Sequence, residues 1–210
     1  MKISKIEPQK RNKSRCSIYI DGEFKFGLTK ALVLKHGLQE GNEINEDEIT
    51  NILLNEEKEK IRNRAFRILQ YRERSVLELR RRLITIGFDP SLVEEIIEDL
   101  VNDDTLNDER FARAFVNDYT RLKPKGNRFV YNELIKRGIS RDLANELLSK
   151  RDEKGLIRNF VRKKIKNFNI GSYKERQKII RRLLNHGFTT STVYEVLDEK
   201  TRPLSSQEDR

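Results

Sequence analysis

The sequence predicts a mainly α-helical fold, an elongated array of three tandem three-helix repeats preceded by a small N-terminal β-hairpin element. Three observations lead to this class. Strand-like alternation is confined to the N-terminal part, and apolar residues recur at helical spacing from Asn45 onward. One helical pattern then returns three times at a nearly constant interval.

The hairpin is predicted around Asp21-Gly22, a dipeptide that supplies the two positive φ angles of a type I′ turn. Apolar residues alternate with others along Arg15–Ile20 before the turn. After the turn, Phe24, Phe26 and Leu28 alternate with other residues and are expected to share one face of the strand. Lys2–Ile6 is a candidate third strand. An isolated hairpin is marginal in water, so a short helix at Ala31–Leu34 is expected to cover it.

Capping residues mark the helix starts that follow. Asn45 precedes three acidic residues, Ser75 precedes a capping-box Glu78, and Asp89 precedes a proline. The face that follows Ser75 is predicted to bury four residues: Val76, Leu79, Leu83 and Ile86.

Three glycines set the repeat. Gly87, Gly138 and Gly187 lie 51 and 49 residues apart, and each ends a helix that is followed by another apolar stripe. We therefore divide the chain into a hairpin element with its short helix (1–44), repeat one with a lead-in helix (45–104), repeat two (105–150), a basic repeat three (151–202) and a flexible tail (203–210).

Composition agrees with such an array. Hydrophobic residues make up 36% of the 210 residues and charged residues 37%, where a typical globular chain has roughly 45–50% and about 25%. A large surface relative to the core suits stacked repeats. The chain has neither a signal-peptide pattern nor an apolar run of membrane-spanning length, so we expect a cytoplasmic protein without membrane attachment.

Positive charge is concentrated in repeat three. The chain carries a net charge of +10, and the segment 154–182 holds eleven basic residues and one acid, Glu175. The charges outside this segment cancel. Since no acid within the segment balances ten of its positive charges, we expect a polyanion or an acidic protein surface as partner.

The candidate nucleic-acid-binding residues are the cations of this segment and of the loop before the second helix of repeat two. In repeat three, Arg158, Arg162 and Lys166 are spaced by four residues and thus share a helix face. In the next helix, four cations cluster within about a 100° arc: Lys174, Lys178, Arg181 and Arg182. The full set is Arg158, Arg162, Lys163, Lys166, Lys174, Arg176, Lys178, Arg181 and Arg182, with Arg121, Lys123, Lys125 and Arg128 in the loop.

No catalytic pattern is found. A glycine-rich phosphate loop, HExxH, G-x-S-x-G and a Cys/His cluster are all absent from the sequence. The single cysteine, Cys16, permits no intrachain disulfide and is expected in a half-buried strand. His36 and His186 each precede a glycine and are interpreted as helix-end residues. We expect no catalytic residue, no metal and no cofactor.

A Mg²⁺-dependent nuclease is the enzymatic alternative, because Asp103, Asp104, Asp108 and Glu109 are close in sequence. Two of these carboxylates follow Asn107, a plausible helix cap, and carboxylates are favoured in a first helical turn. The structural interpretation is therefore preferred.

Several segments resemble the RecX family of RecA modulators. Asn107–Phe115, Lys123–Gly126 and Glu133–Ile139 resemble its central signature, and Arg74–Leu79 is similar to its first repeat. The resemblance implies three-helix repeats that lie in the groove of the RecA–single-stranded-DNA filament. It also implies restraint of ATP hydrolysis and strand exchange, and DNA binding. A monomer is expected.

A helix-turn-helix DNA-binding protein is the alternative from another class, because it also has short trihelical units. Such a protein needs polar side chains for base edges on its recognition helix. The third helices here, at Leu92–Leu100, Leu143–Leu148 and Val193–Leu197, are acidic or apolar instead. Whether the effect on a filament is inhibitory or stimulatory stays open at this point.

Overall fold

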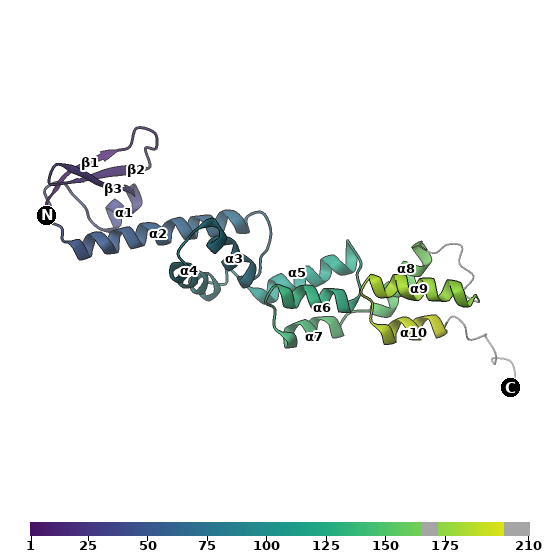
Figure 1. Ribbon diagram of the computed structural model, residues 1–210. Coiled ribbons are helices and arrows are strands. Elements are labelled where there is room, and N and C mark those ends of the chain that lie inside the picture. The colour runs from purple at the N-terminus through teal and green to yellow at the C-terminus, as the bar shows by residue number, and fades with distance from the viewer. Residues whose placement is uncertain (165–171, 200–210) are drawn as a thin grey trace. The chain divides into compact units, whose positions relative to one another are not determined.

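The computed structural model describes residues 1–164 and 172–199, and these form three strands followed by ten helices (Figure 1). The predicted mainly helical class with an N-terminal β element is confirmed. The strands are β1 (Ile3–Pro8), β2 (Arg15–Ile20) and β3 (Glu23–Thr29). The helices are α1 (Lys30–Lys35), α2 (Glu46–Leu69), α3 (Val76–Ile86), α4 (Pro90–Asn102), α5 (Asp108–Arg121), α6 (Asn127–Lys136), α7 (Arg141–Ser149), α8 (Glu153–Lys164), α9 (Tyr173–Asn185) and α10 (Thr190–Glu199). Among the described helices, none combines the length and the apolar character needed to cross a bilayer.

The strands form one antiparallel sheet in the order β1-β2-β3. Asp21 and Gly22 have φ of +50° and +88°, so the predicted turn with two positive φ angles is confirmed. The third strand is also confirmed, since β1 pairs with β2 from Ile3↔Ile20 to Pro8↔Cys16.

The predicted face of β3 is wrong at one residue. Ile18 pairs with Phe26 and Tyr19 pairs with Phe24, so Lys25 is an extra residue in a β-bulge. The bulge turns Phe24 away from the buried side. Its side chain is 56% exposed, and its ring lies 5.8 Å from that of Tyr19.

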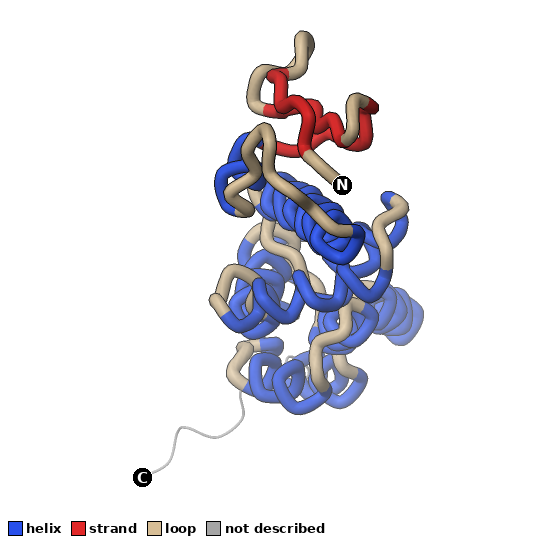
Figure 2. Tube along the Cα trace, turned by 90° about the vertical axis from the view of Figure 1, so that its left-hand side faces the viewer, coloured by secondary structure: helices blue, strands red, loops and turns tan. Residues whose placement is uncertain are grey.

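One face of the sheet packs on α1 and on the first half of α2 (Figures 1 and 2). Ile18, Ile20 and Leu28 are fully buried there, against Ile52 of α2. Glu56 of α2 is also buried. Its carboxylate pairs with the Arg15 guanidinium at 2.5 Å, which ties the sheet to the helix.

The helix starts agree with the capping residues. Asn45 and Glu48 form a complete capping box at the start of α2. The Ser75 hydroxyl accepts a hydrogen bond from the Glu78 amide, and the Asp89 carboxylate accepts from the second and third residues after it. Of the face predicted for α3, Leu79 and Leu83 are fully buried, but Ile86 is 38% exposed. Ile86 is the last residue of the helix, and Val76, the first, is half-buried.

Each of the last two helix triplets has its own apolar core. In α5–α7 the fully buried residues include Val130 and Leu134, and in α8–α10 they include Ile157, Leu183 and Phe188. The chain divides into two compact units: Met1–Arg72 with Arg80–Asn102, and Glu73–Leu79 with the residues from Asp103 onward.

Two contacts inside the second unit follow one plan, and we name each a repeat seam. The first turn of the second helix of one repeat meets the glycine that ends the second helix of the next. In the first seam, the Ser75 hydroxyl donates to the Arg137 carbonyl at 2.6 Å, and a Cβ at Gly138 would lie 2.9 Å from Leu77 Cβ.

In the second seam, the start of α6 meets the turn after α9. The Gly126 and Phe129 amides donate to the His186 and Gly187 carbonyls at 3.1 and 3.3 Å. A Cβ at Gly187 would lie 2.3 Å from Phe129 Cβ, so only glycine fits. The second seam thus fixes repeat two against repeat three, and the first ties the start of α3 to repeat two.

Candidate nucleic-acid interface

Helix α9 separates an apolar face from a cationic face, as predicted. Ile179, Ile180 and Leu183 are buried in the core of repeat three. Lys178 and Arg181 are exposed on the opposite side, and so are Lys174 and Arg182. The predicted division of this helix is therefore present in the structure.

The prediction that the positive charges of repeat three lack acidic partners is wrong in part. Helix α10 supplies three acids, which lie outside the segment in which the charge was counted. Arg158 pairs with Glu199 at 2.7 Å. Lys154 pairs with Glu195, and Arg176 with Asp198. The hydrogen bond from Arg158 also lowers the pKa of the Glu199 carboxyl below its ordinary value.

Three of the four remaining cations of α9 line a hollow of about 650 Å³, which we name the cationic groove; Lys174 is not in its lining. Lys178, Arg181 and Arg182 lie in the second half of α9, with Asn185 as its last residue and His186 as its C-cap. Lys125 joins them from the loop before α6. None of the residues that line this groove is acidic. Two candidate groups that are about 55 residues apart in the sequence are thus brought to one place.

The second repeat seam holds Lys125 beside α9. Its ammonium lies 3.5 Å from His186 Nδ1 and 5.2 Å from the centroid of the Phe129 ring. Arg128, another candidate, donates to the Leu184 carbonyl at 2.9 Å and so caps the C-terminal end of α9. Arg128 therefore contributes to the repeat seam as well as to surface charge.

Arg151, which no pattern in the sequence distinguishes, supports the loop before α6. Its guanidinium donates to Thr120 Oγ1 at 2.7 Å, to Asn127 Oδ1 at 2.8 Å and to the Tyr119 carbonyl. Burial lowers the pKa of this guanidinium below its ordinary value. These three bonds fix the segment that carries Lys125.

Glu153 was also missed. Its carboxylate is buried and accepts the Asn127 amide at 2.6 Å and the Thr189 amide at 3.2 Å. It therefore links the start of α6 to the loop before α10. Acidic residues are common in the first turn of a helix because they interact favourably with its dipole. The sequence alone therefore does not distinguish Glu153 from other such residues.

The other candidates lie apart from the groove lining. Arg121 and Lys123 are exposed at the end of α5 and in the following loop. Arg162 donates to Asn159 Oδ1 at 2.8 Å, and Lys163 is exposed near the end of α8. Lys166 lies outside the described residues.

The acidic residues considered for Mg²⁺ have local structural partners. Asp103 accepts the Thr105 amide at 2.9 Å, and Asp108 accepts the Val76 amide at 2.8 Å. Asp104 and Glu109 pair with arginines of α5 at 3.2 and 2.5 Å. Within residues 1–164 and 172–199, no three His, Cys, Asp or Glu side chains are grouped as a metal site.

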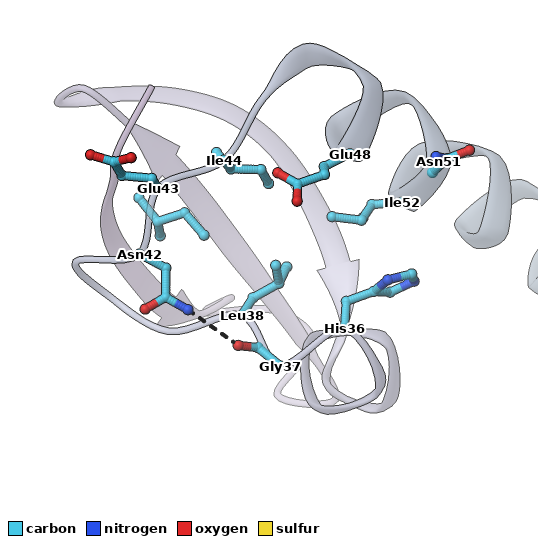
Figure 3. A pocket seen from close by; sticks show the side chains of 10 residues that line it. His36, Gly37, Leu38, Asn42, Glu43, Ile44, Glu48, Asn51 and Ile52 are labelled. Atoms are coloured by element: carbon cyan, nitrogen blue, oxygen red, sulfur yellow. Dashed lines mark hydrogen bonds between the residues drawn. The ribbon is translucent and has the colours of Figure 1, made fainter.

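A second cavity, of about 410 Å³, lies in the N-terminal part of the chain (Figure 3). His36, Glu43, Glu48 and Asn51 are among the residues that line it. His36 is the C-cap of α1, as predicted, and His186 is the C-cap of α9. With two glutamates at its edge, this cavity is less suited to a polyanion than the cationic groove.

Comparisons with known proteins agree on one class, the regulatory proteins built from three-helix domains. Family models match residues 1–45 (regulatory protein RecX N-terminal domain), 62–100 (RecX, first three-helix domain) and 107–148 (RecX, second three-helix domain). A regulatory protein RecX from Bacillus cytotoxicus is 32% identical over 205 residues, which span 94% of this chain and 76% of that protein. Another from Clostridioides difficile is 32% identical over 94% of both chains. The chain belongs to the RecX family.

Solved structures give the same result. A crystal structure of regulatory protein RecX has a TM-score of 0.75 and 26% identity, and the match covers 94% of this chain and 98% of that chain. RecX from Lactobacillus salivarius has a TM-score of 0.57 at 23% identity, over 68% of this chain and 96% of that chain, and is similar in fold.

Proposed function

We propose that this chain binds the RecA–single-stranded-DNA filament and restrains its ATP hydrolysis and strand exchange. It would act without catalysis, in the cytoplasm, as a regulator of recombination, DNA repair and the SOS response. Membership of a family of regulatory proteins supports a regulatory role. The choice of partner rests on the resemblance of the central repeat and on the charge of repeat three.

The observation that carries this proposal is the cationic groove. Four cations line it without an acidic neighbour in the lining. Guanidinium groups suit phosphate oxygens because they can donate two parallel hydrogen bonds. Lysine adds a point charge, and the Asn185 amide can donate a further bond. A nucleic-acid backbone would relieve the mutual repulsion of these side chains.

Contacts of this kind position a protein on nucleic acid without selecting a sequence. The helix-turn-helix alternative would need a third helix that enters a groove of DNA. In repeat three that helix is α10, and its acids Glu195, Asp198 and Glu199 are engaged in ion pairs with basic residues. Because these carboxylates already bind cations of the same repeat, α10 offers few polar groups for base edges, which favours sequence-independent binding.

The test is the rate of ATP hydrolysis by preformed cognate RecA filaments, measured as protein is added. The wild-type chain is expected to lower this rate. Lys178→Glu with Arg181→Glu should require on the order of tenfold more protein for the same effect, since about 1.4 kcal/mol of binding free energy corresponds to tenfold.

A matched control carries the same change in net charge elsewhere. Lys13→Glu with Arg141→Glu alters two exposed cations outside the groove, and this variant should act like wild type. If wild type affects no cognate filament, the proposed function is wrong. If the groove variant equals its control while wild type is active, the filament-binding surface lies elsewhere.

The non-enzymatic part of the proposal has its own test. Purified protein should neither hydrolyse ATP alone nor cut DNA in the presence of Mg²⁺. Cleavage that copurifies with the chain and is lost in Asp103→Asn with Asp104→Asn would overturn it.

A further inference from the structure

The N-terminal sheet carries aromatic side chains on the face opposite the one that packs on α1 and α2. The helices of this unit lie on one side of the sheet only (Figures 1 and 2). On the other side, strand pairing places Lys5 of β1, Tyr19 of β2 and Phe24 of β3 in one row across the sheet. We name this row the aromatic platform.

The β-bulge at Lys25 brings Phe24 to the platform. Strict alternation would put Phe24 on the buried face with Phe26. Because of the bulge it pairs with Tyr19 instead and is 56% exposed, and the two rings make an edge contact with centroids 5.8 Å apart. An exposed phenylalanine gives up the free energy of burial. Since bulges commonly re-aim a side chain beside a functional site, the exposed ring points to a role at the surface.

Glu7 holds the other two members of the platform in place. The Tyr19 hydroxyl donates to Glu7 Oε1 at 2.8 Å. The Lys5 ammonium lies 2.5 Å from Glu7 Oε2 and 5.7 Å from the centroid of the Tyr19 ring. Hydrogen bonds from Lys5 and Tyr19 lower the pKa of the Glu7 carboxyl, and the charge of Lys10, in the loop after β1, adds to this lowering. Cations therefore neutralise the carboxylate beside the platform.

The surroundings of the platform are cationic. Residues 1–30 include eight basic and three acidic residues. An exposed aromatic ring in such surroundings suits a nucleic-acid strand, because every base has a flat face that can stack and every linkage carries a negative charge. Each of the three acids already has a partner: Lys5 for Glu7, Lys25 for Glu23 and the Lys2 amide for Asp21.

We propose that the aromatic platform binds bases of a single-stranded nucleic acid. One base would stack on the ring of Phe24, and Lys10 would contact a phosphate of the same strand. Lys10 follows Pro8, which pairs with Cys16, three residues along β2 from Tyr19. At about 3.3 Å per residue this is about 10 Å, which a few nucleotides of single strand span. A duplex is excluded, because its bases already stack on one another.

This contact goes beyond the proposed function. The platform belongs to the first compact unit and the cationic groove to the second. The groove would contact phosphates, whereas the platform requires bases. Binding at the platform also needs no RecA, so it can be measured with the chain and an oligonucleotide alone.

The test compares two labelled strands of equal length, an oligothymidylate and an abasic oligomer, by fluorescence anisotropy with the full chain. Both strands carry the same phosphates, so the cationic groove would not distinguish them. Wild type should bind oligothymidylate about tenfold more tightly, as expected for stacking on one aromatic side chain. Phe24→Ala should remove this preference and leave binding of the abasic strand unchanged.

Matched variants separate stacking from other effects. Phe24→Leu keeps an apolar side chain without a flat ring and should behave like Phe24→Ala, whereas Phe24→Trp should retain the preference. Tyr71→Ala removes an aromatic side chain that is 88% exposed just after α2 and should behave like wild type. Melting curves show that each variant is folded.

Photocrosslinking locates the contact directly. With iodouracil in the oligothymidylate, the adduct should lie in the tryptic peptide of residues 16–25, which contains both aromatic residues of the platform. Phe24→Ala should lose this adduct.

Three results would overturn the inference. Equal binding of the two strands by wild type would leave the platform to a protein partner. A preference that Phe24→Leu retains would show apolar contact without stacking. Adducts found only outside residues 16–25 would place the bases elsewhere. None of these results bears on the filament ATPase test, so the two proposals fail separately.

Discussion

The salt dependence of binding to single-stranded DNA distinguishes cations that contact phosphates from cations that the protein already neutralises. Lys178 and Arg181 line the cationic groove, and no described acid forms an ion pair with either. Lys154 and Arg158 lie in the same repeat but pair with Glu195 and Glu199 of α10. Replacing either pair by alanine removes two positive charges.

The expected sizes of the two effects differ. Each phosphate contact with a single strand contributes about −0.7 to the slope of log K against log salt. Lys178→Ala with Arg181→Ala should therefore flatten the slope by about 1.4. Lys154→Ala with Arg158→Ala should change it much less, because carboxylates already neutralise these side chains.

The assay is fluorescence anisotropy of a labelled oligothymidylate between about 50 and 200 mM salt. Melting curves for both variants show that the fold is retained. Equal flattening in the two variants would refute the reasoning, since bulk charge alone would then explain the salt dependence. A larger effect at Lys154 and Arg158 would place the phosphate contacts on α8.

Three further predictions concern stability. Glu153→Ala leaves two amides without their acceptor and should cost about 2–4 kcal/mol in urea unfolding, with Glu153→Gln less severe; a loss below about 1 kcal/mol would contradict this role. Leu134→Ala, in a fully buried position of repeat two, should cost about 2–5 kcal/mol through a cavity, and a change near zero would show that the core closes around it. Hydrogen bonds from Arg137 and Lys136 hold the pKa of the Glu133 carboxyl below its ordinary value, so its stabilisation is present above the pKa of the unfolded chain and is lost as pH falls through the lowered pKa. Thermal unfolding of Glu133→Gln should accordingly depend less on pH in this acidic range, and an unchanged pH profile would exclude the contribution.

The helical part of the fold could be predicted because its signals are local. Asn45 and Glu48 are three residues apart and cap one helix, and Gly138 and Gly187 end helices by adopting positive φ. Each of these features depends on a few consecutive residues. The exposed Ile86 shows the limit of this reasoning. Helical periodicity gives the direction of a side chain but does not show whether another element covers it.

What could not be predicted depends on contacts between distant residues. The bulge at Lys25 moves Phe24 to the other face by one residue of register, which alternation along a single strand does not reveal. Arg158 and Glu199 are 41 residues apart, so charge counted along the sequence could not pair them. The candidate cations were identifiable by type, but the groove needed α9 and the loop at Lys125 to be placed together.

The fold should be sensitive to changes in the length of helix α2, because the two halves of this helix pack in different parts of the core. Its first half contributes Ile52 to the core under the sheet, and its second half buries Ile61, Ala65 and Ile68. Each residue turns an α-helix by about 100° and lengthens it by about 1.5 Å. One residue inserted between Ile52 and Ile61 would therefore swing the sheet about a quarter turn around the helix axis, whereas seven would nearly restore its direction about 10 Å further along. In homologues we expect insertions and deletions in this helix to come in steps close to whole turns, while the surface loops vary freely in length.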